Sequence, residues 1–246
     1  MNKTCNYEFT IVVPIYNEKE NLERLEQVFS AYLPTCQRRA CVLFVNDGST
    51  DGSLDGIRNM CSRHTDFLFL SFRKNCGLSA AIKAGFDYCE SPLVGYIDAD
   101  LQTTPEDFNL LLQHSDDFEL VMGIRAHRKD KLGKRLQSKI ANGFRRSMTG
   151  DDAQDTGCPL KVLHTSVAKR VPMFTGMHRF LPALVMLQEG RIRQVPVRHF
   201  PRVAGTSKYH LWNRLVSPFM DCFAYRWMRK RWYNYDVAEQ NLTPDA

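Results

Sequence analysis

The chain has 246 residues, of which 43% are hydrophobic and 24% charged; this is enough for one large core, and no change of composition marks a second. The net charge of +6 favours an acidic partner such as a nucleotide, a phosphate or an anionic membrane face, and nothing indicates nucleic acid. The sequence shows neither the pattern of a secretory signal nor an apolar run long enough to span a membrane, so we expect neither feature.

Strands alternate with helices through the first half of the chain. Apolar runs predict strands at 9–13, 41–45, 67–72 and 93–97, and apolar residues at helical spacing predict helices at about 20–32, 54–61 and 79–88. This alternation predicts an α/β fold with a mostly parallel, doubly wound sheet flanked by helices. Ligands of such sheets bind at the carboxyl ends of the strands.

The second half continues with fewer strands. We expect strands at 120–124 and 193–200, the latter at an edge, and helices at about 136–148 and 177–187. A turn is expected at 155–159, a flexible basic loop at 202–209 and a long helix at 211–232. The eight cysteines include no C-x-x-C pair, and several lie in apolar stretches, which is typical of a reducing, cytoplasmic compartment.

Two carboxylates, Asp98 and Asp100, end the fourth predicted strand, and Gln102 follows at the same alternate spacing. Side chains at alternate positions point the same way, and a divalent cation between oxygen ligands relieves the repulsion of two carboxylates. The alternative is that the two carboxylates only cap or pair locally. We predict that these three residues bind a divalent cation.

The chain contains neither G-x-G-x-x-G after its first strand nor G-x-x-x-x-G-K-[ST], so a nucleotide must be held without these phosphate-binding loops. Asp47, in the turn after the second strand, can accept a hydrogen bond from a base or ribose. Tyr16 offers a ring face, and Glu18 a further acceptor. Alone, the Asn-Asp-Gly-Ser cluster at 46–49 is weak, because tight turns commonly use these residues.

Together, five ordered motifs resemble those of family 2 glycosyltransferases, which have the GT-A fold. The motifs are PIYNE at 14–18, NDGS at 46–49, NCG at 75–77 with Ala81 and Gly85, DADLQ at 98–102, and the basic loop at 202–208. The resemblance covers about residues 9–209. It is closest to the polyprenyl-phosphate branch, dolichyl-phosphate mannose synthases and bacterial undecaprenyl-phosphate glycosyltransferases. Asn46 departs from the Asp of many members. Most bacterial relatives continue into transmembrane helices, which we do not expect here.

The resemblance implies a metal-dependent hexosyltransferase that uses a UDP- or GDP-sugar, with Mg²⁺ or Mn²⁺ bound by Asp98, Asp100 and Gln102. The donor-site residues it implies are Pro14, Tyr16, Glu18, Val45, Asp47, Asp98, Ala99, Asp100, Gln102, Arg125, Arg202 and Lys208. Arg202 and Lys208 would stabilise the charge of the departing pyrophosphate. We name Asp100, Arg202 and Asp155 as the catalytic candidates.

A phosphate monoester acceptor is already a nucleophile at neutral pH and needs positioning more than deprotonation. The residues suited to position it are Arg125, Arg128, Lys134, Arg135 and Ser138. A single in-line displacement would invert the anomeric carbon. Two alternatives stay open: a transferase acting on a glycan or soluble hydroxyl, with Asp155 as its base, and a non-catalytic sugar-nucleotide-binding protein.

The helix at 211–232 has an aromatic and apolar stripe beside a dense set of cations. The stripe comprises Trp212, Leu215, Phe219, Phe223 and Trp227, and the cations are Arg214, Arg226, Arg229, Lys230 and Arg231. This pattern predicts either a helix on an anionic membrane or one that packs on the sheet or on a second subunit in a homo-oligomer. We therefore expect a GT-A catalytic domain at 1–210, a membrane-interface or dimerisation helix at 211–235 and a disordered tail at 236–246. We expect the protein to be peripheral on the cytosolic face of a membrane.

Overall fold

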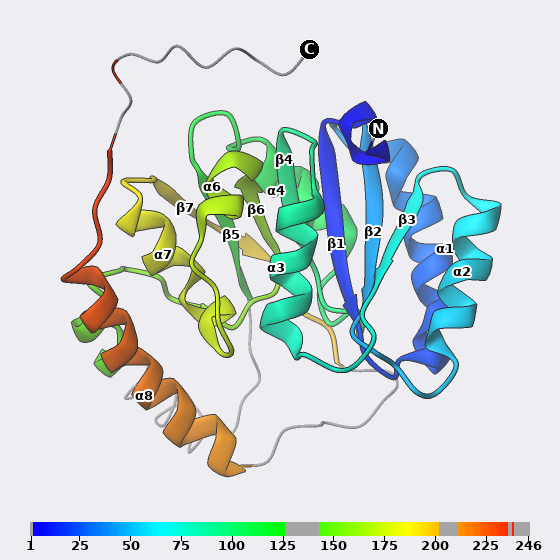
Figure 1. The fold of residues 1–246 in the computed structure, drawn as a ribbon. Coiled ribbons are helices and arrows are strands. Elements are labelled where there is room, and N and C mark those ends of the chain that lie inside the picture. The colour runs from blue at the N-terminus through cyan, green and yellow to red at the C-terminus, as the bar shows by residue number, and fades with distance from the viewer. Residues whose placement is uncertain (1, 126–142, 202–210, 236–237, 239–246) are drawn as a thin grey trace.

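The computed structural model describes residues 2–125, 143–201, 211–235 and 238, with the backbone alone at 211–218. Within these ranges one seven-stranded sheet has the order β3-β2-β1-β4-β6-β5-β7 (Figure 1). Its strands are β1 Phe9–Ile15, β2 Ala40–Asn46, β3 Phe67–Ser71, β4 Leu93–Tyr96, β5 Leu120–Arg125, β6 Lys161–His164 and β7 Ile192–Val197.

The main helices are α1 Leu22–Tyr32, α2 Ser53–Arg63, α3 Leu78–Tyr88, α4 Phe108–Leu112, α6 Thr165–Arg170, α7 Leu181–Leu187 and α8 Leu211–Arg229, and residues 143–149 are also helical. Short 3-10 helices occur at Lys3–Asn6, Lys19–Asn21, Leu33–Thr35, Pro105–Asp107 and Met177–Phe180. The predicted strands and helices in the described ranges are therefore present, with boundaries shifted by a few residues.

The sheet is mostly parallel, as the sequence predicts. β1 pairs in parallel with both β2 and β4, β2 with β3, and β5 with β7, which lies at the edge. β6 was not predicted, and it runs antiparallel between β4 and β5. This strand has only four residues and begins with a lysine, so it lacks the apolar run that identifies the other strands.

Helices cover both faces of the sheet, which confirms the doubly wound arrangement. One core cluster joins the sheet to α1, α2 and α4, and the other joins it to α3, α6, α7 and α8. None of the helices in the described parts of the chain combines the length and apolar character needed to cross a membrane.

α8 packs against α7 and the helix at 143–149. The face of α8 that makes these contacts is not the stripe that the sequence pattern selected. Cys222 and Tyr225 are buried there, and the Tyr225 hydroxyl donates a 3.1 Å hydrogen bond to the carbonyl of Ala183. Phe219 and Phe223 face outward and contact the Phe144 ring at centroid distances of 5.0 and 6.4 Å. The helix ends at Arg229 rather than Trp232, because the next turn tightens into a bond from the Arg231 amide to the Met228 carbonyl.

Candidate active site

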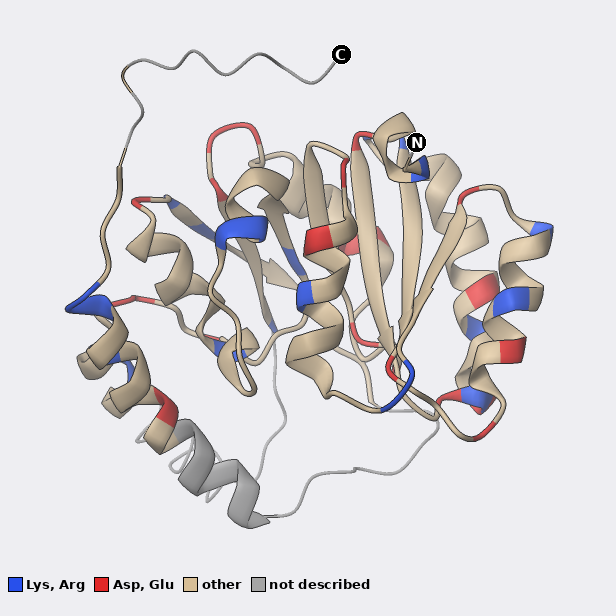
Figure 2. Cartoon of the chain, in the orientation of Figure 1, with Lys and Arg blue, Asp and Glu red and all other residues tan. Residues whose placement is uncertain are grey.

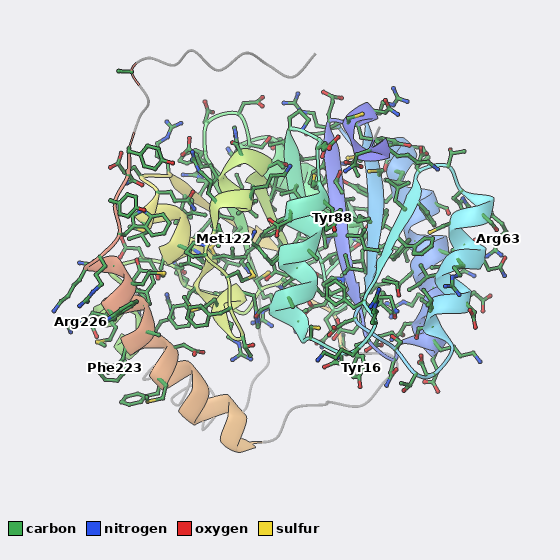
Figure 3. All side chains as sticks on the ribbon, in the orientation of Figure 1. Tyr16, Arg63, Tyr88, Met122, Phe223 and Arg226 are labelled. Carbon is green, nitrogen blue, oxygen red and sulfur yellow. The ribbon has the colours of Figure 1, made fainter. Side chains whose placement is uncertain are left out.

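Three parallel strands bring the predicted donor residues to one edge of the sheet. The register pairs Ile15 of β1 with Asn46 of β2, and the amide of Asp47 donates a 2.8 Å hydrogen bond to the carbonyl of Ile15. β4 ends beside them, with the Ile97 amide bonded to the Val12 carbonyl at 3.1 Å. The segments after β1, β2 and β4 therefore meet at the carboxyl edge, where Figure 3 labels Tyr16 at the lower end of β1.

The segment after β4 alternates in exposure. Asp98, Asp100 and Gln102 are half-buried, whereas the residues between them, Ala99 and Leu101, are at most 6% exposed. Leu101 has a left-handed backbone (φ 49°), its amide bonds to the Asp98 carbonyl at 3.3 Å, and the Gln102 amide bonds to Asp100 Oδ1 at 3.2 Å. This turn keeps the three oxygen-bearing side chains on the open side.

The residues present fit a hard divalent cation. Mg²⁺ is commonly bound by one or two carboxylates together with water and substrate phosphates, and two carboxylates plus an amide oxygen match that chemistry. No group of three His, Cys, Asp or Glu side chains that could hold a metal gathers anywhere in the described ranges. A cation at this edge would therefore depend on Asp98 and Asp100, with Gln102 and ligand oxygens completing its shell.

Asp47 joins the loop after β2 to the loop after β3. Its Oδ1 accepts a 2.6 Å hydrogen bond from the Cys76 amide, and its Oδ2 accepts 2.8 Å bonds from the Asn75 side chain and the Gly77 amide. At Gly48 (φ +64°), a Cβ would come within 2.3 Å of the Lys74 carbonyl carbon, so the two loops are in close contact. Sequence reasoning predicted Asp47 as a nucleotide acceptor but missed these bonds.

A second set of bonds fixes the loop that carries Tyr16 and Glu18. The Asn17 amide donates to Ser49 Oγ at 3.0 Å, and the Glu18 amide donates to Ser53 Oγ at 3.0 Å. These serines belong to the segment after β2, so the two loops that would flank a nucleotide are positioned together.

Other predicted donor residues differ in their access to this edge. Pro14 is half-buried, whereas Val45 is 0% exposed and Ala99 6% exposed. The side chains of Val45 and Ala99 lie in the core clusters on opposite faces of the sheet and do not face an open site. Asn46 is buried too, and its amide nitrogen donates a 2.9 Å hydrogen bond to Ser71 Oγ, which links β2 to the end of β3.

Arg125, at the end of β5, forms an ion pair with Asp155. Arg125 Nε and Nη2 each lie 2.7 Å from a different oxygen of the Asp155 carboxylate, and the Arg125 amide donates to the same side chain at 3.2 Å. The two side chains are 16% and 9% exposed. A Cβ at Gly157 would come within 3.1 Å of Arg125 Nη2, so the glycine leaves space for the guanidinium.

Lys161 is a residue of this region that sequence reasoning missed. It is 0% exposed, and its ammonium group donates hydrogen bonds to the Tyr96 hydroxyl (3.1 Å), the Thr156 carbonyl (3.4 Å) and the Cys158 carbonyl. Burial lowers the pKa of Lys161 to about 8. A lysine at the start of a short strand is usually solvated, so its pattern gave no signal of a buried cation.

The chain after β7 approaches the motif at 98–102. The Phe200 amide donates to the Gln102 carbonyl at 2.8 Å, and Arg198 forms 2.7 Å hydrogen bonds with both oxygens of Asp107. The six remaining predicted residues lie outside the described ranges: Arg128, Lys134, Arg135, Ser138, Arg202 and Lys208.

Curated relatives share much of this chain. It is 34% identical over 208 residues to dodecaprenyl-phosphate galacturonate synthase of Rhizobium johnstonii, an alignment that covers 82% of this chain and 62% of the relative. It is 32% identical over 214 residues to undecaprenyl-phosphate 4-deoxy-4-formamido-L-arabinose transferase of Edwardsiella ictaluri, covering 86% of this chain and 66% of the relative. The chain thus spans slightly less than two thirds of these relatives.

Solved structures are similar in fold at low sequence identity. Glucosyl-3-phosphoglycerate synthase of Mycobacterium tuberculosis, solved with Mn²⁺, UDP and glucosyl-3-phosphoglycerate, matches with a TM-score of 0.63 and 14% identity, over 93% of this chain and 82% of that one. A mannosyltransferase of Pyrobaculum calidifontis, solved with GDP-mannose and Mn²⁺, matches with a TM-score of 0.60 and 17% identity, over 89% and 63% of the two chains. These similarities confirm the GT-A fold.

The family model of glycosyl transferase family 2 matches residues 10–173. This range begins in β1 and includes the segments after β1, β2 and β4 as well as the Arg125–Asp155 pair. The chain belongs to glycosyl transferase family 2.

Proposed function

We propose that this glycosyltransferase moves a sugar from a nucleotide-diphosphate donor to a polyprenyl phosphate carrier. The observation that carries the proposal is the placement of Asp98, Asp100 and the Arg125–Asp155 pair at the carboxyl edge, in a chain similar to two enzymes named for polyprenyl-phosphate products or acceptors. Transfer of a hexose stays a prediction, because those relatives are named for galacturonate and a formamido-arabinose.

For the donor side, we assign the nucleotide to the joined loops that carry Tyr16, Glu18 and Asp47. We assign Mg²⁺ or Mn²⁺ to Asp98, Asp100 and Gln102, where it would compensate the negative charge of the departing nucleoside diphosphate. Arg202 and Lys208 follow the anchored segment at 198–200 in the chain, and we assign them to the same leaving group.

The contacts of Asp155 favour a phosphate acceptor over a hydroxyl. Both of its oxygens already accept hydrogen bonds from Arg125, so the carboxylate positions the guanidinium rather than standing ready to remove a proton. A phosphate monoester needs no base at neutral pH and requires positive groups that orient it. Arg125, held by Asp155, suits that task.

α8 supports a location at a membrane surface. Its outward face exposes Phe219 (47%), Phe223 (46%) and Trp227 (61%), while its inward face is occupied by Cys222 and Tyr225. The exposure of these side chains supports a membrane surface over packing of the stripe on the sheet. Figure 2 shows Lys and Arg at the C-terminal end of α8, and aromatic residues beside cations favour the headgroup layer of an anionic leaflet.

The test is transfer to a polyprenyl monophosphate from a panel of UDP- and GDP-sugars in the presence of Mn²⁺. We expect the lipid-linked sugar to form with one donor and to be absent with the corresponding polyprenol, which lacks the phosphate. Transfer to the alcohol or to a soluble glycan instead would favour the hydroxyl-acceptor alternative. Donor binding with no transfer to any acceptor would favour a non-catalytic binding protein.

A further inference from the structure

The two edges of the sheet differ in how they are protected against further strand pairing. At the β7 edge, the parallel register turns the backbone of Gln194 and Pro196 away from β5. Proline has no N–H to offer there, and the Gln194 side chain bonds to the backbone of residues 152–154. At the opposite edge, β3 (Figure 1) has the sequence FLFLS at 67–71, without a proline or a charge. Edge strands of soluble proteins commonly carry such protective residues, so β3 is unusual.

The outward backbone groups of β3 are open. The Asp66 carbonyl accepts a hydrogen bond from β2, and the Phe72 amide donates one to the Asn46 carbonyl, so the even-numbered residues face β2. Odd-numbered residues therefore direct their N–H and C=O groups away from the sheet. Among the residues that the structure describes, none forms a hydrogen bond with the backbone of Phe69 or Ser71 on this outer side. These groups are available to an added strand.

A cavity of about 500 Å³ borders this strand and is lined by residues 67–70. It has walls on both faces of the sheet, because the side chains of β3 alternate between the two core clusters. On one face the wall includes Arg58 and Cys61 of α2, and on the other it includes Tyr88 at the end of α3. An extended chain added at this edge would place alternate side chains against the two walls.

The N-terminal 3-10 helix forms part of the wall beside α3. The side chain of Asn2 donates a 2.6 Å hydrogen bond to the Tyr88 carbonyl, and the Glu90 amide donates a 2.9 Å bond to Thr4 Oγ1. These bonds hold the backbone on both sides of Lys3, which also lines the cavity. The wall is therefore a fixed part of the fold.

The charged residues that line the cavity are basic. Lys3 and Arg58 belong to the lining, whereas no Asp or Glu of the described ranges does. Arg58 pairs with Asp55 at 3.1 Å, but these side chains are 57% and 83% exposed, so this weak pair leaves the guanidinium available to another carboxylate. Arg73 and Lys74 are exposed just after the strand. This charge favours an acidic partner and opposes a two-fold pairing of β3 with a second copy, which would bring like charges together.

We propose that the β3 edge is a docking site for an extended acidic peptide segment of another protein, which adds a strand to the sheet. The backbone of the peptide bonds to Phe69 and Ser71. Its apolar side chains contact Phe69 and Tyr88, which are 39% and 61% exposed, and its carboxylates meet Lys3 and Arg58. The site is separate from the candidate active site, since none of the predicted donor residues that the structure describes lines this cavity.

The experiment uses two synthetic peptides of about eight residues, one alternating valine with glutamate and the other valine with lysine. Their binding to the full chain is measured by fluorescence anisotropy at low salt. We expect the glutamate peptide to bind about 10-fold more tightly than the lysine peptide. Lys3→Gln with Arg58→Gln should weaken its binding on the order of 10-fold. Lys230→Gln with Arg231→Gln, which removes equal charge from exposed positions beyond α8, should not.

Amide hydrogen exchange, resolved by NMR, tests the backbone contact. We expect the bound glutamate peptide to slow exchange at Phe69 and Ser71 and to leave Leu68 and Leu70, which already face β2, unchanged. Phe69→Pro removes one outward N–H and should weaken binding on the order of 10-fold. If this variant does not melt like the wild type, the exchange pattern of the wild type decides.

The proposal is overturned if the glutamate peptide does not bind, if both peptides bind equally, or if exchange slows away from β3. Slow exchange at Phe69 and Ser71 in concentrated protein without peptide, together with a dimer in analytical ultracentrifugation, would assign the edge to a second copy and overturn the peptide site. None of these measurements uses a sugar donor or acceptor, so the proposed function is tested separately.

Discussion

The side chains of Arg125 and Asp155 form a bidentate ion pair at the end of β5, with two N–O distances of 2.7 Å between residues thirty positions apart in the chain. Replacing one residue of such a pair leaves the other with a largely buried charge and no counter-charge. Removing both charges together avoids that cost, so the pair can be studied by a double-mutant cycle.

We expect Asp155→Asn to lower the free energy of unfolding by about 3 kcal/mol, because the Arg125 guanidinium loses its counter-charge in a site that is 16% exposed. Urea denaturation measures this change. The double variant Arg125→Met, Asp155→Leu is expected to recover most of the stability while transfer stays low. A double variant no more stable than Asp155→Asn would mean that packing, rather than charge, holds this region.

Asp100→Asn removes one charge from the predicted metal-binding segment on its half-buried, open side. We expect transfer to fall on the order of a thousandfold and the Mn²⁺-dependent thermal shift with nucleotide to disappear, while the melting temperature without ligands is kept. Asp117→Asn, at an exposed position between α4 and β5, is the matched control. Full turnover in Asp100→Asn would contradict the metal assignment.

The Asp47 carboxylate accepts three hydrogen bonds from N–H groups of residues 75–77. In Asp47→Asn one of its oxygens becomes an NH₂ group, which cannot accept a hydrogen bond from these N–H donors. We expect faster amide hydrogen exchange at residues 73–77 and weaker nucleotide binding, because the loop after β3 loses its attachment to β2. Asp55→Asn, whose exposed carboxylate pairs with Arg58 on the surface of α2, should leave both measurements unchanged. Unaltered exchange at 73–77 in Asp47→Asn would show that these bonds do not order the loop.

The pKa of Lys161 gives a prediction for alkaline pH. Burial lowers this pKa from 10.5 to about 8, so between these values the unfolded chain holds a proton that the folded chain has lost. Stability contributed by this group therefore rises with pH across that window, by at most about 3 kcal/mol. We expect the stability difference between wild type and Lys161→Met to shift in favour of the wild type from pH 7.5 to pH 10, measured by urea denaturation at each pH. A difference that does not change with pH would contradict a lowered pKa of Lys161 in the folded protein.

Lys230 and Arg231 are exposed just beyond α8, and the Arg231 guanidinium lies 4.7 Å from the ring centroid of Trp227. Replacing both with Gln is expected to weaken binding to anionic vesicles about 30-fold at low salt, at about 1 kcal/mol for each charge, and to leave nucleotide binding intact. The control is Lys3→Gln with Arg58→Gln, at exposed positions near β3 on the opposite side of the sheet. Equal vesicle binding by both double variants would favour a second subunit as the partner of this face.

The sequence predicted those parts of the fold that carry a periodic apolar signal. The strands before Tyr16, Asp47 and Asp98 were found because each is a short apolar run followed by polar residues, and that same order placed all three at one edge. Contacts between distant positions have no such signal. The hydrogen bonds of Asp47 with 75–77 depend on how two loops pack together, so no pattern within either loop reveals them.

α8 shows a second limit. Its most hydrophobic positions form the stripe that periodicity selects, yet the face that packs inward consists of Cys222 and Tyr225, which contribute less to such a pattern.

The reversed direction of β6 determines which of its flanking segments reaches the carboxyl edge. A strand parallel to β4 would begin at the opposite edge and reach the carboxyl edge only after its last residue. Because β6 is antiparallel to both neighbours, residues 155–158 enter it from the carboxyl edge, and β5 still points the same way as β4. One strand reversal thus brings an incoming segment, with Asp155, to the outgoing end of another, with Arg125, so that two segments far apart in the chain meet at the carboxyl edge.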